Sequence, residues 1–267
     1  MTMRSRPSDR LHRILAEKGR VLVSYSGGVD STVLAAAARE VLGQKSSCVI
    51  LDSPLLPRRS LKKALDRAVM LGLDVEVIPF PILGDPRFVE NPEERCYLCK
   101  KLACRLLKQK AEESGIVCVV DGVQLSDLDE FRPGLRACQE EGVSHPLAEA
   151  GMTKEDVRES ARRSGLNFWD EPSAACLASR IPYGEAVTTR NLARIEQAED
   201  HLHDLGFDQV RVRTHGTIAR IEVLSRDIER ALSLRKEIVS LLRDLGYDYV
   251  TLDLEGFRSG SLDLHVR

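Results

Sequence analysis

The 267-residue sequence has no long apolar run, no excess of one charge sign, and only 4% aromatic residues. No stretch approaches the length that spans a bilayer, so we expect no membrane association. The 39 lysine and arginine residues are balanced by 41 aspartate and glutamate residues, which argues against nucleic acid as a partner through bulk electrostatics. Trp169 is the single tryptophan, and we expect it in the core.

The amino-terminal residues also lack the apolar core of a secretory signal, because they lead directly into a polar helix. We therefore expect a cytoplasmic protein, in which the seven cysteines are thiols. Cys48 and Cys118 lie in apolar strand-like runs and are predicted to be small core residues. Cys104 and Cys138 fall in expected helices, and their spacing assigns them no role.

Strand and helix patterns alternate in the first half of the chain. Strands are expected at 21–25, 48–52, 74–79 and 116–120, and helices at 1–19, 31–42, 58–71, 100–114 and 153–164. This alternation predicts an α/β fold with a doubly wound parallel sheet. Beyond it, a helix at 188–205, strands at 209–213 and 217–223, a helix at 226–245 and a strand at 248–254 predict a smaller α+β domain. We place the two domains at 1–184 and 185–267.

The segment between the first strand and its helix predicts an anion site. Glycines permit a tight turn and close backbone approach, and the following helix start offers free N–H groups and partial positive charge. A carboxylate in such a turn suits a divalent cation between it and phosphate. Asp52, after the second strand, is expected at the same sheet edge. The expected pyrophosphate and magnesium ligands are Ser26, Gly27, Gly28, Asp30, Ser31 and Asp52.

This glycine turn lacks the Gly-Lys-Ser/Thr ending of a Walker A loop and is not Gly-x-Gly-x-x-Gly either. It resembles the PP-loop of the ATP pyrophosphatases, which split ATP between the α and β phosphates and adenylylate a substrate. A glycine-rich turn without a ligand is the alternative. The strand–turn–helix context favours an ATP site.

Two further groups of residues indicate chemistry. Cys96 and Cys99 form a C-x-x-C pair at a helix start, where thiolates are favoured, but one such pair is weak evidence for a metal and fits a plain reduced pair as well. Cys176 lies far away in sequence. Arg211 and Arg213 alternate along a strand and share one face, which suits either phosphate binding or a solvated surface.

Several motifs together resemble the LarE family. They are the PP-loop, Asn91-Pro-Glu-Glu-Arg-Cys-Tyr-Leu-Cys-Lys100, Ala175-Cys-Leu-Ala-Ser-Arg-Ile-Pro-Tyr-Gly184 and the segment from Gly206 to Glu222. LarE proteins are ATP-dependent sulfur transferases that make the nickel-pincer nucleotide cofactor. The resemblance implies that ATP adenylylates a carboxylate of pyridinium-3,5-dicarboxylic acid mononucleotide, releasing pyrophosphate. A sulfur nucleophile then displaces AMP to give a thiocarboxylate.

The family resemblance implies two sulfur sources. In one branch the cysteine matching Cys176 is consumed and becomes dehydroalanine. In the other, three cysteines matching Cys96, Cys99 and Cys176 hold a [4Fe-4S] cluster that carries the transferred sulfide, and we favour this branch. The resemblance also makes Arg211, Arg213 and Arg180 ligands of the substrate phosphate, although Arg180 can instead pair with Asp170. Glu199 and Glu222 match acidic positions and are expected, with Asp30, near magnesium.

The sequence departs from its relatives in two places. Gln124 and Ser126 replace expected Asn and Asp, and Glu171 stands where a basic residue is expected, which puts a phosphate contact there in doubt. A PP-loop tRNA thiolase is the main alternative, but the chain lacks a basic surface. An ATP sensor without turnover is a further alternative. Relatives form hexamers, so we expect a homo-oligomer, and a separate sulfide donor protein is a further expected partner.

Overall fold

The computed structural model describes residues 6–129, 133–172 and 175–258, and the chain divides into two compact units. The first unit comprises Met1–Ser53, Arg58–Ile82 and Cys96–Ala174, and the second comprises Pro54–Pro57, Leu83–Arg95 and Ala175–Arg267. Two short internal segments are therefore grouped with the carboxyl-terminal part of the chain. In the described ranges, no helix has the length and apolarity needed to cross a bilayer.

A four-stranded parallel sheet forms the centre of the first unit, in the order β3-β2-β1-β4. Its strands are β1 (Val21–Ser24), β2 (Ser46–Asp52), β3 (Val75–Pro79) and β4 (Cys118–Val120). In the register, Val21 of β1 lies opposite Ser46 on one side and Cys118 on the other. The predicted parallel sheet is confirmed.

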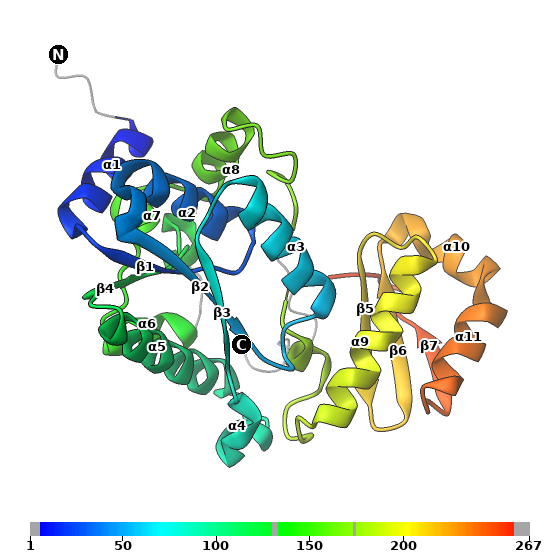
Figure 1. The fold of residues 1–267 in the computed structure, drawn as a ribbon. Helices are drawn as coiled ribbons and strands as arrows, with labels where there is room; N and C mark the ends of the chain where they lie inside the picture. Colours follow the sequence, from blue (N-terminus) through cyan, green and yellow to red (C-terminus); the bar gives the residue numbers. More distant parts are fainter. Residues whose placement is uncertain (1–5, 130–132, 173–174, 259–267) are drawn as a thin grey trace. The chain divides into compact units, whose positions relative to one another are not determined.

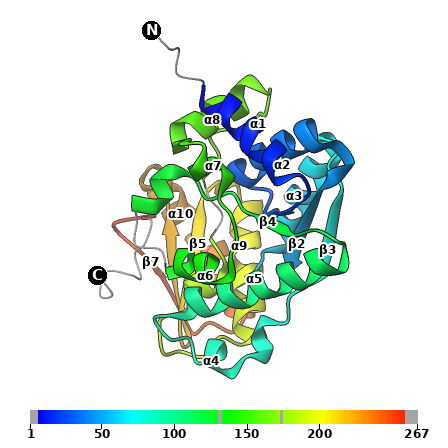
Figure 2. The same cartoon turned by 90° about the vertical axis from the view of Figure 1, so that its left-hand side faces the viewer.

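Helices cover both faces of this sheet (Figures 1 and 2). On one face α2 (Val29–Leu42) contacts β1 and β2, and α1 (Pro7–Lys18) and α8 (Lys154–Arg163) contact α2. On the other, α5 (Arg95–Glu113) and α6 (Pro133–Glu141) contribute Cys104 and Cys138 to a core with Leu22 and Val49. Helices α3 (Arg58–Met70) and α7 (Pro146–Glu149) also belong to this unit, whereas α4 (Pro86–Val89) belongs to the second. The helix expected from residue 100 begins at Arg95.

The carboxyl ends of β1, β2 and β4 meet at one edge because these strands run in the same direction. The segments that follow them are the PP-loop (residues 26–31), Ser53 and the pair Asp121 and Gly122. A Cβ on Gly122 would lie 2.8 Å from the backbone nitrogen of Ser31. The residues that follow β4 therefore pack directly against the start of α2. The expected position of Asp52 at the same edge as the PP-loop is confirmed.

The second unit contains a three-stranded sheet, with β5 (Val210–His215) antiparallel to β6 (Ile218–Val223) and β6 parallel to β7 (Tyr249–Leu252). Helices α9 (Thr189–Asp204), α10 (Ile228–Ser233) and α11 (Arg235–Asp244) contribute to one core with this sheet. The α+β prediction is confirmed, but the single helix expected over 226–245 is wrong. The helix breaks at Leu234, whose backbone (φ −90°, ψ 8°) leaves α geometry without a glycine or proline to mark it in the sequence.

Candidate functional site

The PP-loop closes on itself through its two serines. The Ser26 and Ser31 hydroxyls lie 3.0 Å apart, and Ser31 Oγ donates to the Gly28 carbonyl at 3.1 Å. Gly27 adopts φ +73°, and Gly28 is the N-cap of α2. The loop therefore places two hydroxyls beside the start of a helix, where backbone N–H groups have no intrahelical partner. This is the geometry that the sequence predicts for binding phosphate.

Helix α3 packs against the PP-loop. A Cβ on Gly27 would lie 2.4 Å from the Cβ of Ala64, so only glycine fits this approach. Arg67 donates from Nη1 to the Gly27 carbonyl at 2.6 Å, and its Nη2 donates to the carboxylate of Glu171. Glu171 also accepts from Lys63 at 2.9 Å. Glu171 therefore holds Arg67 in place against the loop. This role could not be predicted from the sequence around Glu171.

Asp30, the carboxylate of the PP-loop, has a cationic partner that the sequence analysis missed. Lys154 Nζ lies 2.8 and 2.6 Å from the two carboxylate oxygens of Asp30. The pair joins the first turn of α2 to the first residue of α8, which are 124 residues apart in sequence. No local spacing could have revealed this contact. Asp52 also has a cationic partner, since Arg58 Nη2 lies 2.6 Å from its carboxylate.

The loop after β4 uses its polar residues for its own structure. The side-chain oxygen of Gln124 accepts from the Ser126 backbone nitrogen at 2.6 Å, and Asp127 accepts from the Gln124 backbone nitrogen at 3.2 Å. The Ser126 hydroxyl in turn accepts from the backbone nitrogen of Lys154 at 3.4 Å. The two residues that depart from the family pattern therefore shape the loop that leads to Lys154.

Asp121 is buried, and buried or half-buried titratable side chains lie around it. Its carboxylate accepts from Lys100 Nζ at 2.9 Å, and it lies 2.6 Å from His145 Nδ1 and 3.6 Å from Cys138 Sγ. Burial alone would raise the pKa of Asp121, but the charges of Lys100 and His145 hold it below its ordinary value. Cys104 Sγ lies 3.8 Å from Cys138 Sγ. The sequence analysis assigned no role to Lys100 or His145, and it left Cys104 and Cys138 without one.

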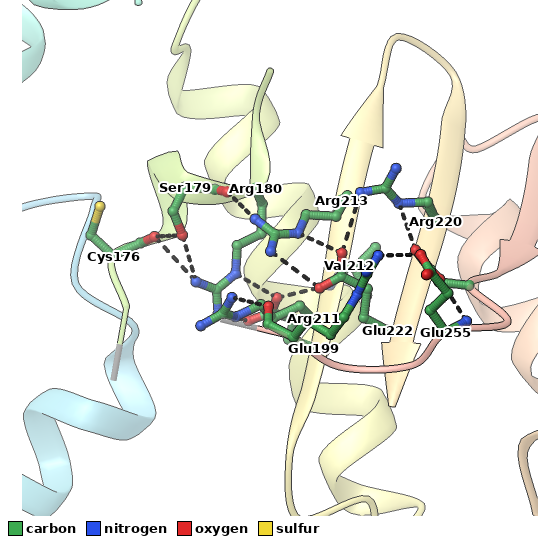
Figure 3. Close-up of polar contacts among 12 residues, drawn as sticks. Cys176, Ser179, Arg180, Glu199, Arg211, Val212, Arg213, Arg220, Glu222 and Glu255 are labelled. Atoms are coloured by element: carbon green, nitrogen blue, oxygen red, sulfur yellow. Dashed lines mark hydrogen bonds and ion pairs between the residues drawn. The ribbon is translucent and has the colours of Figure 1, made fainter. Parts of the chain in front are cut away.

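The second unit carries two buried arginine–glutamate pairs (Figure 3). Arg213, 2% exposed, bonds to Glu222, 0% exposed, through Nε at 3.0 Å and Nη2 at 3.1 Å. Arg180 bonds to Glu199 through Nε at 2.8 Å and Nη2 at 2.9 Å. A solvated strand face is therefore excluded for Arg213. The partner of Arg180 is Glu199, and the alternative pairing with Asp170 is wrong.

Arg211 lies beside these pairs but stacks on an aromatic ring. Its guanidinium carbon is 4.3 Å from the centre of the Phe257 ring. Burial, followed by the positive charges of Arg180 and Arg213, lowers the pKa of Arg211 to about 10. Arg180 and Arg213 therefore repel the charge of Arg211, and Glu222 and Glu199 offset this repulsion in part. An anion placed there would relieve that repulsion.

The three cysteines of interest belong to different units. Cys96, exposed, and Cys99, half-buried, lie in α5 in the first unit, and Cys176 is exposed in the second. Arg180 Nη1 donates to the Cys176 carbonyl at 3.2 Å. Across the described ranges, no three His, Cys, Asp or Glu side chains form a group that could hold a metal ion. Trp169 is 36% exposed, so its expected place in the core is wrong.

A parallel sheet with a serine-flanked glycine turn at its carboxyl edge defines a nucleotide-binding protein of the PP-loop ATP pyrophosphatase class. No family model matches the chain. The chain is 38% identical over 250 residues to pyridinium-3,5-bisthiocarboxylic acid mononucleotide synthase of Lactiplantibacillus plantarum, a match that covers 93% of this chain and 91% of that protein. The chain belongs to the LarE family of PP-loop sulfurtransferases, and it is an enzyme.

Two other relatives agree with this placement. An uncharacterised protein of Synechocystis sp. is 40% identical over 257 residues, covering 96% of each chain. The glutamine-hydrolysing GMP synthase of Chlamydia muridarum is 28% identical over 127 residues, covering 47% of this chain and 25% of that one. The match to GMP synthase fits the ATP-binding fold of the first unit.

Proposed function

We propose that this enzyme converts a carboxylate of pyridinium-3,5-dicarboxylic acid mononucleotide to a thiocarboxylate at the expense of ATP, in the biosynthesis of the nickel-pincer nucleotide cofactor. The observation that carries the proposal is a complete PP-loop in a chain that matches a mononucleotide synthase over nearly its whole length. The name of that relative gives a bisthiocarboxylic acid mononucleotide as the product, and the dicarboxylic acid substrate is what the family resemblance implies. The chemistry below is argued from the residues of this chain.

In the first step a substrate carboxylate oxygen attacks the α phosphorus of ATP, and pyrophosphate leaves. The backbone N–H groups at the start of α2 and the hydroxyls of Ser26 and Ser31 are placed to hold the departing pyrophosphate. The carboxylate of Asp30 is the donor type that Mg²⁺ prefers, and a bound Mg²⁺ would neutralise phosphate charge there. Glu199 and Glu222 do not fit this cation, because each is bonded to a buried guanidinium.

The substrate phosphate is assigned to Arg211, with Arg213 and Arg180 beside it. Arg213 and Arg180 are fixed by their glutamates, so their positive charges cannot move away from Arg211. A phosphate binding there would gain charge-assisted hydrogen bonds without ordering flexible side chains. This electrostatic argument favours a phosphate over a neutral ligand at this end of the second unit.

The exposed thiols are compatible with two proposals for the sulfur source. We propose that Cys96, Cys99 and Cys176 hold a [4Fe-4S] cluster, since Cys96 and Cys99 lie one helical turn apart near the surface and Cys176 is exposed. If these three thiolates held the cluster, it would supply a sulfide for transfer at the iron without a protein thiolate. The competing proposal uses Cys176 alone: its thiolate attacks the acyl adenylate, AMP leaves, and elimination across Cα–Cβ leaves dehydroalanine and a thiocarboxylate. The exposure of Cys176 supports either source.

The test is an anaerobic reaction with ATP and the dicarboxylate mononucleotide, in which AMP, pyrophosphate and thiocarboxylate are quantified. AMP release that requires the ring carboxylates supports the proposed reaction, and ATP binding without release refutes it. Iron and acid-labile sulfide per chain, lost on Cys96→Ser, support the cluster. One product per chain, with loss of sulfur from Cys176 by mass spectrometry, supports consumption of the cysteine. The cytoplasmic location, the homo-oligomer and the sulfide donor protein stay predictions.

A further inference from the structure

Two buried thiols face each other between α5 and α6. Cys104 of α5 and Cys138 of α6 are 1% and 0% exposed, and their sulfur atoms lie 3.8 Å apart. Both views of the fold show these two helices side by side (Figures 1 and 2). The two cysteines are 34 residues apart in sequence, so only the fold brings them together. The proposed function uses neither of them.

Ion pairs between the two helices hold the thiols in this alignment. Lys101 Nζ lies 2.6 Å from the carboxylate of Glu140, and Arg105 Nε lies 2.8 Å from that of Glu141. The two cations lie on either side of one thiol along α5, and the two glutamates follow the other thiol in α6. A disulfide bond is about 2.05 Å long, so the sulfur atoms need to approach each other by about 1.8 Å to form one.

The surroundings give the two thiols different tendencies to ionise. A hydrogen bond from Cys138, supported by the positive charge of Lys100, holds the pKa of Cys104 below its ordinary value. The hydrogen bond to Cys104 and burial raise the pKa of Cys138. Asp121 keeps the lysine in place, since its carboxylate accepts from Lys100 Nζ at 2.9 Å. The thiolate is the reactive form of cysteine, so Cys104 is suited to attack first and Cys138 to attack second.

Metal binding and simple core packing explain this pair less well. A structural zinc site needs four ligands, and the described ranges contain no group of three or more His, Cys, Asp or Glu side chains suited to a metal ion. Cys48 shows what a cysteine that only packs in the core looks like here, because burial and the charge of Asp74 raise its pKa to about 12. Cys104 is equally buried, but it lies beside a second thiol and near a lysine.

We propose that Cys104 and Cys138 form a reversible disulfide when the protein is exposed to hydrogen peroxide. The Cys104 thiolate attacks one peroxide oxygen, the O–O bond breaks, and hydroxide leaves, which gives a sulfenic acid at Cys104. The sulfur of Cys138 then attacks the sulfenic sulfur and breaks its S–O bond. The hydroxyl group and the thiol proton of Cys138 leave together as water, and the earlier hydroxide takes the proton that Cys104 released on ionising. The two thiols lose two electrons, which reduce the peroxide to water, and a dithiol restores both thiols.

The disulfide would also change the hydrogen bonds of Asp121. In the reduced protein Cys138 donates to Asp121 Oδ2 at 3.6 Å, and a disulfide sulfur has no hydrogen to donate. Asp121 directly precedes Gly122, the residue that packs against the backbone of Ser31. Oxidation of the pair therefore removes one contact from the segment that follows β4. The proposal does not depend on the proposed function, because no step of it uses ATP or the mononucleotide.

The experiment treats the reduced full-length protein with hydrogen peroxide, blocks the remaining thiols with iodoacetamide in denaturant, and analyses the unreduced peptides by mass spectrometry. The expected product is a peptide pair linked through Cys104 and Cys138, lighter by two hydrogen atoms than the separate peptides and released by dithiothreitol. The proposal is overturned if both thiols stay free at a peroxide dose that oxidises the exposed Cys176. It is also overturned if the main product links either cysteine to a different thiol.

Single variants test the order of attack. In Cys138→Ala, Cys104 should stop at the sulfenic acid and react with dimedone, whereas in Cys104→Ala the remaining Cys138 should stay a thiol. Dimedone labelling of Cys138 instead of Cys104 would overturn the assigned order. Cys138→Val provides a second variant with a different side-chain volume if the alanine variant does not fold, which circular dichroism melting checks. Cys48→Ala is the matched control, because it removes another buried thiol and should leave the yield of linked peptide unchanged.

A further variant separates direct oxidation from transfer through the exposed thiols. In the triple variant Cys96→Ser, Cys99→Ser, Cys176→Ser, the linked peptide should form with the same yield, because peroxide reacts with Cys104 itself. Loss of the linked peptide in this variant would overturn the direct reaction. The triple variant also lacks the thiols assigned to sulfur transfer, so a linked peptide there supports the disulfide whether or not the proposed function is correct.

Discussion

Replacing Gly27 by alanine should damage both the stability of the first unit and its nucleotide site. Gly27 has φ +73°, a conformation that costs an L-residue about 1–2 kcal/mol. The added methyl group would also lie 2.4 Å from the Cβ and 2.6 Å from the Cα of Ala64. Because one of these atoms is backbone, a side-chain rotation cannot relieve the overlap. Either α3 or the loop must move.

The expected magnitude is the sum of two effects. Overpacking of this kind costs about 1–3 kcal/mol, so Gly27→Ala should lower the free energy of unfolding by about 2–5 kcal/mol. Gly43 provides the matched control, since it has φ +56° and a methyl group added there would meet no atom of the described residues within 4 Å. Gly43→Ala should therefore show the conformational cost alone. The Gly27→Ala, Ala64→Gly double variant should recover part of the difference, because it removes the Cβ overlap and leaves the Cα overlap.

The assay is urea unfolding followed by circular dichroism, together with ATP titration of each folded variant. The loop displacement should weaken ATP binding in Gly27→Ala and leave it unchanged in Gly43→Ala. Equal destabilisation by the two substitutions would refute the reasoning, because it would mean that α3 yields without cost. Unaltered ATP affinity in a destabilised Gly27→Ala protein would refute the placement of the phosphate site at this turn.

Three other predictions concern an ion pair, a histidine and the thiols. Glu222→Gln should cost about 3–5 kcal/mol in urea unfolding, because it leaves Arg213 buried without its counter-charge, whereas the exposed Glu229→Gln should cost less than about 0.5 kcal/mol. Burial alone would lower the pKa of His145, but its hydrogen bond to Asp121 raises that pKa above 6.5. The pair therefore stabilises the fold fully below about pH 6.5, and this stabilisation is lost as the pH rises through the raised pKa. The stability difference between the unaltered protein and His145→Gln should shrink from pH 6 to pH 9, and a pH-independent difference would contradict the assignment. Iodoacetamide in native buffer, followed by peptide mass spectrometry, should label exposed thiols before buried ones. The early group is Cys96 and Cys176, and the late group is Cys48, Cys104 and Cys138.

The sequence predicted those parts of the fold that local patterns determine. Apolar runs alternating with helical periodicity indicated the parallel sheet, and the glycines after Tyr25 indicated the turn at its edge. Strand direction then placed Gly122 near Ser31 without any direct signal between them. The break at Leu234 was missed because no glycine or proline marks it in the sequence.

The site residues that were missed are those whose roles depend on partners far away in sequence. Lys154 reads as an ordinary residue at a helix start, and Glu171 reads as a departure from the family. Only the fold brings Lys154 to Asp30 and Glu171 to Arg67. The sequence does show one oddity that could have served as a signal: a lysine directly after a helix cap runs against the dipole.

We propose that the buried pairs of the second unit serve ligand binding more than stability. Replacing a buried ion pair by apolar residues is often neutral or stabilising, so stability alone does not explain why Arg213 and Glu222 are buried in this small unit. What the pair does provide is a guanidinium that cannot move. Arg180 is fixed by Glu199 in the same way. The positive charges of Arg180 and Arg213 therefore act on Arg211 already in the absence of a ligand. A phosphate that binds there is then stabilised by charges already in place, as a preorganised site requires.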